Sequence, residues 1–224
     1  MKTIVVSDLH LAPRFIQPKF EFLSHLFSTV DRVIINGDFW EGSMFTFDDF
    51  VNSPWSELFP VLKSRQTVYL YGNHDPASLV DDRVNSFSDE QAEFYQFDWQ
   101  VPVYLEHGHR LIQGLERLNF LSNKMILRKI GHSISGSIED LGIRLFGPSF
   151  SRVFVRRDLE NKVIKNRLSK KTAKDAVYIT GHTHRPAQAA GKVQYYNTGC
   201  ILYGFADYLV ITDQEIILKR ERYR

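Results

Sequence analysis

Two histidines stand two residues apart in the stretch GHTHRP, which covers 181–186 and directly follows the apolar run AVYIT. In an extended segment the side chains at positions i and i+2 point to the same side, so the imidazoles of His182 and His184 could reach one common point. Imidazole nitrogen is a common ligand of transition metals. The alternative interpretation is a polar turn that ends a strand, and companion ligands elsewhere in the chain must decide between the two.

The other apolar, β-branched runs also end in residue types that bind metals. The runs and the polar residues that follow them are TIVVS (3–7) with Asp8 and His10, RVIIN (32–36) with Asp38, TVYLY (67–71) with Asn73 and His74, and VPVYLE (101–106) with His107 and His109. In open α/β sheets the carboxyl ends of the strands gather along one edge, where ligands bind. We therefore expect these side chains to meet at one place.

The donors expected at this edge are carboxylates, imidazoles and an amide oxygen. Mixed nitrogen and oxygen donors are typical of Mn²⁺, Fe or Zn²⁺ sites, and they argue against an all-oxygen Ca²⁺ site or a thiolate zinc site. The donors are too many for one open catalytic ion. Two ions that share a bridging carboxylate, roughly 3.5–4 Å apart, account for them better.

The elements that must position these residues alternate between strands and helices. Residues 18–30 carry Phe20, Leu23, Phe27 and Val30 on one helical face. After GHTHRP come the strand-like runs VQYYN, YLVIT and EIILK, of which the last two predict a hairpin. This order predicts an α/β fold with a mainly parallel sheet that is covered by helices on both sides.

Length and composition fit one soluble domain over residues 1–224, with a mass of 26.1 kDa. The single cysteine excludes an intramolecular disulfide framework and fits a reducing compartment. No segment approaches the ~18 consecutive apolar residues of a membrane span. We therefore expect a cytoplasmic protein.

The charge is distributed unevenly along the chain. Residues 1–109 carry 7 Lys and Arg against 16 Asp and Glu, whereas residues 110–174 carry 15 against 5. The segment 110–174 is also helix-leaning, and we interpret it as a basic helical insertion, or cap, within the domain. A basic block of this kind suggests an anionic partner, although a solvated helical surface that faces an acidic neighbour is the alternative.

Three basic residues of this insertion share one helical face, and apolar residues such as Leu121 and Met125 lie largely apart from them. The three are Arg117, Lys124 and Arg128. A basic amphipathic helix suits an anionic lipid head group or a membrane surface, here the inner face of the cytoplasmic membrane. A helical hairpin packed on the core and a track for single-stranded nucleic acid are the alternatives, the second being less favoured.

Taken together, the strings SDLH, GD, GNHD, HGH and GHTH resemble the signature of calcineurin-like metallophosphoesterases. The resemblance covers 1–109 and 176–200. It implies a two-sheet β sandwich flanked by helices, with a dinuclear metal centre in which Mn²⁺ is favoured ahead of Fe or Zn²⁺. By position, one ion would take Asp8, His10, Asp38 and His184, and the other would take Asp38, Asn73, His107 and His182.

The resemblance also implies how the remaining polar residues act. The two ions would activate a bridging hydroxide that attacks phosphorus. His74, which is left without a metal to bind, would stabilise the transferring group and protonate the leaving oxygen, and Glu41 would orient it. We place His109 and Arg185 beside the substrate, where His109 could instead orient His107.

The substrate class is less sharply defined than the centre. The strings SDLHL, GDFWE and GHTHRP are similar to those of bacterial UDP-2,3-diacylglucosamine pyrophosphatases, but His74 and His109 stand where that group has Arg and Asp. These departures favour a related homologue with a different specificity. We expect hydrolysis of a nucleotide- or lipid-linked phosphoester or pyrophosphate. A nuclease or phosphomonoesterase with the same centre is the alternative, and a non-catalytic scaffold is less favoured because every metal-binding residue type is present.

Overall fold

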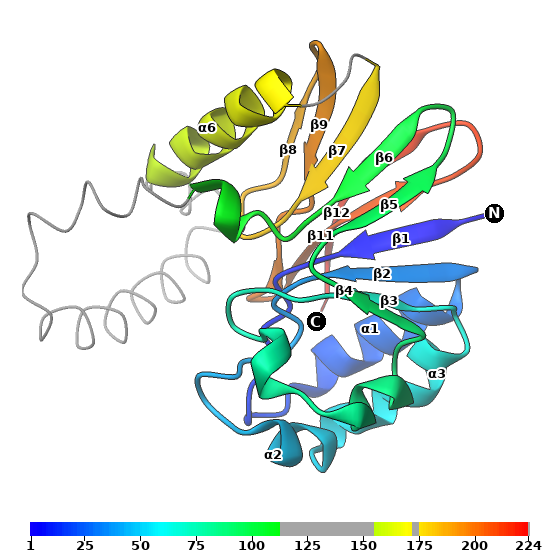
Figure 1. Ribbon diagram of the computed structural model, residues 1–224. Coiled ribbons are helices and arrows are strands. Elements are labelled where there is room, and N and C mark those ends of the chain that lie inside the picture. Colours follow the sequence, from blue (N-terminus) through cyan, green and yellow to red (C-terminus); the bar gives the residue numbers. More distant parts are fainter. Residues whose placement is uncertain (113–154, 172–174, 224) are drawn as a thin grey trace, which may run out of the picture.

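Two β-sheets face each other in the computed structural model, which describes residues 1–112, 155–171 and 175–223 (Figure 1). The predicted basic residues Arg117, Lys124 and Arg128 lie outside the described residues, so their placement stays a prediction. The α/β architecture with two sheets and flanking helices confirms the fold that the sequence motifs implied.

The larger sheet has seven strands in the order β10-β11-β1-β2-β3-β4, with β12 paired to β11. Strands β1 to β4 run parallel, and β11 joins β1 in the antiparallel sense. The bounds are β1 (Thr3–Val6), β2 (Arg32–Asn36), β3 (Val68–Leu70), β4 (Glu90–Ala92), β10 (Ile201–Leu202), β11 (Phe205–Ile211) and β12 (Ile216–Arg222). The pair β11–β12 is the predicted hairpin.

The smaller sheet has five strands in the order β5-β6-β7-β9-β8, in which β6, β7 and β9 run parallel. The bounds are β5 (Tyr95–Asp98), β6 (Pro102–Leu105), β7 (Ala176–Thr180), β8 (Ala187–Ala189) and β9 (Val193–Asn197). The strand expected at 101–106 therefore belongs to a second sheet. The sequence pattern alone predicted one sheet and did not separate the two.

The core between the sheets is made by alternate residues of the buried strands. Val5 and Ile34 of the larger sheet pack with Val103, Val177 and Ile179 of the smaller one. Because successive strand residues point to opposite faces, Ile4 and Val6 pack instead on the outer side of the larger sheet. Both faces of the central strands are buried, which explains their almost uninterrupted apolar sequences.

Helices cover the outer face of each sheet. On the larger sheet lie α1 (Gln17–Ser28), α2 (Phe47–Val51) and α3 (Phe59–Lys63), with short 3₁₀ turns η1 (Pro54–Leu58), η2 (Ala77–Leu79) and η3 (Asp82–Ser86). Leu23 and Phe27 of α1 are buried there, as the helical pattern predicted. No helix within the described ranges is long and apolar enough to cross a membrane.

The smaller sheet is covered by α6 (Val155–Lys171), the carboxyl-terminal part of the predicted insertion. Its residues Ile164 and Leu168 pack on Tyr178 and Tyr195, and the 3₁₀ turn η4 (His109–Ile112) closes the same cluster. The described parts of 110–174 are thus packed on the sandwich itself (Figure 1).

Candidate metal centre

The loops that follow β1, β2 and β7 hold their polar residues in an uncommon backbone conformation. Five of the eight non-glycine residues with positive φ in the described part of the chain are predicted ligands: Asp8 (53°), His10 (44°), Asp38 (52°), His182 (67°) and His184 (54°). Left-handed backbone is uncommon for non-glycine residues and is often found at functional sites. The extended segment expected for GHTHRP is therefore wrong, because each left-handed residue turns the chain.

The turned backbone sends the two histidines of GHTHRP into different clusters. His184 Nε2 lies 3.2 Å from Asp8 Oδ1 and 3.0 Å from His10 Nε2. His182 instead joins Asp38 and His107, whose Oδ2 and Nε2 atoms are 3.2 Å apart. In each cluster the potential ligand atoms lie within 4.8 Å of one another, a spacing that allows them to surround one ion.

Asp38 belongs to the second cluster and also approaches the first. Its Oδ2 atom is 3.2 Å from His107 Nε2 and 3.7 Å from His10 Nε2, so one carboxylate oxygen approaches an imidazole of each cluster. Asn73, the amide ligand expected from the resemblance, follows Gly72 in the adjoining loop and is exposed. Among the described residues its side chain makes no hydrogen bond to the proposed ligands, and its role stays a prediction.

Unsatisfied buried atoms at this place fit a bound cation. Asp8 Oδ1 and His107 Nε2 are buried and, although His184 Nε2 and Asp38 Oδ2 respectively lie 3.2 Å away, neither atom makes a hydrogen bond of suitable geometry among the described residues. Leaving such a buried group unpaired costs about 1–3 kcal/mol. A metal ion would coordinate both atoms and remove that cost.

The charges around His107 also fit a bound cation. Burial alone would lower the pKa of its imidazole, but the carboxylates of Asp38 and Asp8 outweigh burial and raise the pKa to about 10. Burial and the neighbouring His107 lower the pKa of His182 to about 3, so that imidazole stays neutral. Without a metal, a proton on His107 balances the carboxylates; a metal ion would replace that proton and release it to water.

Hydrogen bonds on the far side of two imidazoles orient them for metal binding. His10 Nδ1 lies 2.8 Å from Glu41 Oε2, and His107 Nδ1 lies 2.9 Å from the carbonyl oxygen of Asn36. A proton held at Nδ1 by these acceptors leaves the Nε2 lone pair available on the ligand side.

Glu41 also holds His74, as the resemblance implied. Its Oε1 atom is 2.7 Å from His74 Nδ1, so one carboxylate joins His10 of the first cluster to the proposed acid. Burial would lower the pKa of His74, but the bond to Glu41 and the charge of Asp38 raise it to about 9. His74 is therefore protonated at neutral pH and able to donate a proton to an anionic oxygen.

The sequence motifs gave no role to Asp75, the last residue of GNHD. This buried carboxylate accepts hydrogen bonds from the backbone N–H groups of Gly72 (2.8 Å), Asp38 (2.9 Å) and Phe39 (2.6 Å). It therefore ties the loop after β3 to the loop that carries Asp38. Gly72 fits between them only because it has no Cβ, which would lie 2.1 Å from Asp38 Oδ1.

A second residue that sequence reasoning missed is Asn161 of α6. Its Nδ2 donates to the carbonyl oxygen of Arg185 (3.0 Å), and its Oδ1 accepts from Thr183 Oγ1 (3.0 Å) and Tyr195 OH (3.1 Å). Asn197, at the end of β9, donates to Asn161 Oδ1 (3.2 Å) and to the Gly181 carbonyl oxygen (2.7 Å). A polar residue within a helical pattern gives no sequence signal for this buried network.

Asn161→Leu is expected to weaken Mn²⁺ binding about tenfold, because outer residues that orient ligands typically contribute 10–100-fold to metal affinity. The substitution removes the contacts that hold the 181–186 loop to α6. Leu168→Ala is the control, since it loosens the same helix without touching that loop. Calorimetric Mn²⁺ titration of both variants checks this: equal affinities in the two would contradict a positioning role.

The remaining predicted substrate contacts lie near the centre. The ring of His109 is 5.6 Å from that of His107 and 6.1 Å from that of His182, and burial lowers its pKa to about 4. Arg185 follows His184 directly, and its Nε lies 3.0 Å from Asp158 Oδ1 of α6.

Comparison with known proteins identifies the family. The family model of calcineurin-like phosphoesterases matches residues 1–186, which include all five strand-end motifs. No curated protein matches the chain. Among solved structures, similar folds include YfcE, a phosphoesterase from E. coli (18% identity, all of both chains, TM-score 0.49).

Two further solved structures are similar in fold. One is a dimetal phosphatase from Danio rerio (11% identity, 94% of this chain and 91% of that one, TM-score 0.49). The other is a metallophosphoesterase from Sphaerobacter thermophilus (13% identity, 100% and 90%, TM-score 0.44). Family membership rests on the family model. The chain belongs to the calcineurin-like phosphoesterases, a family of metal-dependent hydrolases that act on phosphoester bonds.

Proposed function

We propose that this enzyme holds two divalent ions, Mn²⁺ ahead of Fe or Zn²⁺, and hydrolyses a phosphodiester or pyrophosphate in a lipid- or nucleotide-linked substrate. The observation that supports it is the pair of ligand clusters that meet at Asp38, each with a buried atom that makes no hydrogen bond in the described part of the chain. When bound, such ions lower the pKa of a coordinated water and neutralise charge on the phosphoryl oxygens.

The protein's own groups have separate tasks in this proposal. Asp38 holds both halves of the centre together, and Asp75 fixes the backbone that presents it. His74, protonated and oriented by Glu41, gives its proton to the oxygen of the leaving group. The leaving group should therefore lie on the His74 side of the centre.

A pocket of mixed character adjoins the centre on that side. It has a volume of about 480 Å³; its apolar lining residues are Trp40, Met44, Phe45, Phe47 and Leu79, and its polar ones are Ser43, Thr46 and Asp49. Gly42, another lining residue, donates its N–H to the carbonyl oxygen of His74 at 3.2 Å. The apolar residues of the lining could hold an alkyl or acyl group, and this supports a lipid-linked leaving group in the proposal.

The basic segment 110–174 is part of the same proposal. We propose that it contacts the anionic portion of the substrate or of a membrane surface, and its excess of 15 basic over 5 acidic residues supports this.

A pair of UDP esters tests the substrate class. In the presence of Mn²⁺, UDP-decyl ester is expected to show a KM about tenfold below that of UDP-methyl ester, because the longer chain buries additional methylene groups. Leu79→Asn should remove most of this difference. Leu159→Asn is the matched control, since Leu159 is an exposed leucine on α6. Chromatography of released UMP and alkyl phosphate gives both rates.

The same assay separates the alternatives. Turnover of p-nitrophenyl phosphate or single-stranded DNA alone would assign a phosphomonoesterase or a nuclease. Absence of turnover of every ester, in protein that contains metal, would favour a binding scaffold. Equal KM values for the two UDP esters would contradict the lipid-linked substrate.

A further inference from the structure

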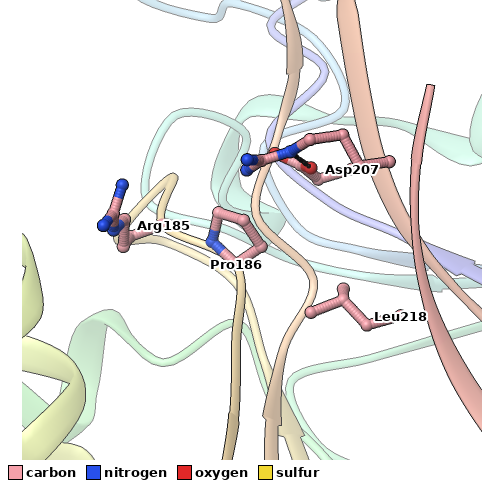
Figure 2. A pocket seen from close by; sticks show the side chains of 5 residues that line it. Arg185, Pro186, Asp207 and Leu218 are labelled. Atoms are coloured by element: carbon pink, nitrogen blue, oxygen red, sulfur yellow. Dashed lines mark hydrogen bonds and ion pairs between the residues drawn. The ribbon is translucent and has the colours of Figure 1, made fainter. Parts of the chain in front are cut away.

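A second pocket adjoins the loop that carries His182 and His184. It has a volume of about 290 Å³ and is lined by Arg185, Pro186, Asp207, Leu218 and Arg220 (Figure 2). Arg185 and Pro186 come from the loop that leads into β8 of the smaller sheet. The other three come from β11 and β12 of the larger sheet. Both sheets therefore contribute a guanidinium group to one small pocket.

The pocket is close to the proposed ligands along two chain segments. Arg185 is the residue after His184, and the Cα atoms of consecutive residues are only 3.8 Å apart. On the other wall, the N–H of Asp207 donates to the carbonyl oxygen of Cys200 (3.0 Å), and the residue after Cys200, Ile201, donates to that of Asp8 (3.4 Å). A group bound in this pocket would therefore lie close to the proposed metal ligands.

Asp207 fixes the guanidinium of Arg220. The carboxylate accepts from Arg220 Nε at 2.6 Å and Nη2 at 3.1 Å, and its side chain is only 6% exposed. A buried partner that holds two of the five N–H donors keeps the arginine in one orientation. The Nη1 atom of Arg220 has no partner among the described residues.

Arg185 has still more free donor capacity. Its one side-chain bond in the described part of the chain joins Nε to Asp158 Oδ1, which leaves both Nη atoms without a partner there. Its charge also reaches Asp207: burial raises the pKa of that carboxyl, and both arginines oppose the increase. The pocket is thus lined by two arginines that together have at least three guanidinium nitrogens without a partner among the described residues.

We propose that this pocket is a subsite for a second anionic group of the substrate, phosphate-like in charge and geometry, next to the phosphoester that is cleaved. Guanidinium N–H groups arranged from two sides match the tetrahedral oxygens of a phosphoryl group. This proposal rests on the proposed function for the position of the first phosphoryl group. The substrate would then carry two anionic groups joined by a short linker, as in a bisphosphate or a pyrophosphate with a further phosphate.

A series of non-hydrolysable ligands that differ in the spacing of their two anionic groups tests the subsite. Alkane-α,ω-bisphosphonates with two to six carbons are compared with alkylphosphonates of the same length by calorimetry, in the presence of excess Mn²⁺. At least one length should bind about tenfold more tightly than its monophosphonate, because hydrogen bonds to a charged group contribute that much. In Arg220→Lys, the affinity advantage of the bisphosphonate over the monophosphonate should fall to about twofold, the statistical factor for a ligand with two equivalent phosphonate groups.

Two additional variants separate loss of the subsite from loss of the fold. Arg220→Gln combined with Asp207→Asn removes both charges, so no buried charge is left unpaired, and the preference should be lost here as well. Lys219→Gln is the control: it removes a basic side chain one residue away, on the opposite face of β12. This control should keep the wild-type preference.

The proposal is overturned if no linker length gives more than about twofold preference in the wild type, or if both Arg220 variants retain it. Turnover of bis(p-nitrophenyl) phosphate with Mn²⁺ is measured on the same samples. Loss of turnover with a retained bisphosphonate preference would reject the proposed hydrolysis and keep the subsite. Normal turnover without the preference would reject only the subsite.

Discussion

Asp38→Asn is expected to remove both metal ions from the protein and to lower turnover of bis(p-nitrophenyl) phosphate by more than about 10²-fold. Its carboxylate oxygen lies within 4 Å of an imidazole of each cluster, so one substitution weakens both halves of the centre. The loss should exceed the ~10–100-fold cost of changing a residue that only orients a ligand. Elemental analysis after purification with Mn²⁺, followed by steady-state kinetics, measures both effects.

The matched control is Asp98→Asn, which makes the same chemical change at an exposed position of β5. It should keep about two ions per chain and normal turnover. If Asp38→Asn retained one ion at full affinity, the two clusters would be independent. One ion or none in the wild-type protein would contradict the dinuclear centre itself.

His74→Ala is expected to retain metal but to lose far more activity on an alkyl ester than on a p-nitrophenyl ester. General acid catalysis contributes roughly 10²–10⁴-fold when the leaving oxygen needs a proton, and nitrophenolate leaves without one. The raised pKa of His74 and its bond to Glu41 are the structural reasons to expect this proton donor. Rates on a dialkyl phosphate and on bis(p-nitrophenyl) phosphate, with metal content measured in parallel, provide the comparison.

His25→Ala serves as the control, because His25 is an exposed histidine in α1. Its rates on both esters should match those of the wild type. Equal losses on the two esters in His74→Ala would show that His74 acts mainly on the phosphoryl group and not on the leaving oxygen.

The proposed ligands of the centre could be selected from the sequence because each one follows an apolar strand. Asp8 after TIVVS and Asp38 after RVIIN are examples in which local pattern and position in the sheet give the same answer. The conformation of GHTHRP could not be predicted in this way. Asp and His accept left-handed backbone more readily than most residues, but whether they adopt it depends on the loops packed around them.

Residues that act through tertiary contacts were harder to find. Asn161 resembles an ordinary polar residue of a helix, and only the packing of α6 on the smaller sheet brings it to the loop after β7. Asp75 was visible within GNHD, but its three backbone donors come from two separate loops. Likewise, in the sequence Arg220 is one of several charged residues in the last strand-like run. Only the structure shows that it lines the same pocket as Asp207 and Arg185.

If the five left-handed residues bind metal as proposed, their backbone conformation should also tie the lifetime of this protein to the supply of metal. Such residues cost of order 1 kcal/mol each, and the sum is comparable with the ~5–15 kcal/mol by which a typical domain is stable. Metal-free chains would therefore open more often around these loops and be degraded faster, a difference that proteolysis with and without Mn²⁺ measures. Metal starvation would then deplete the cell of the protein as well as of its reaction.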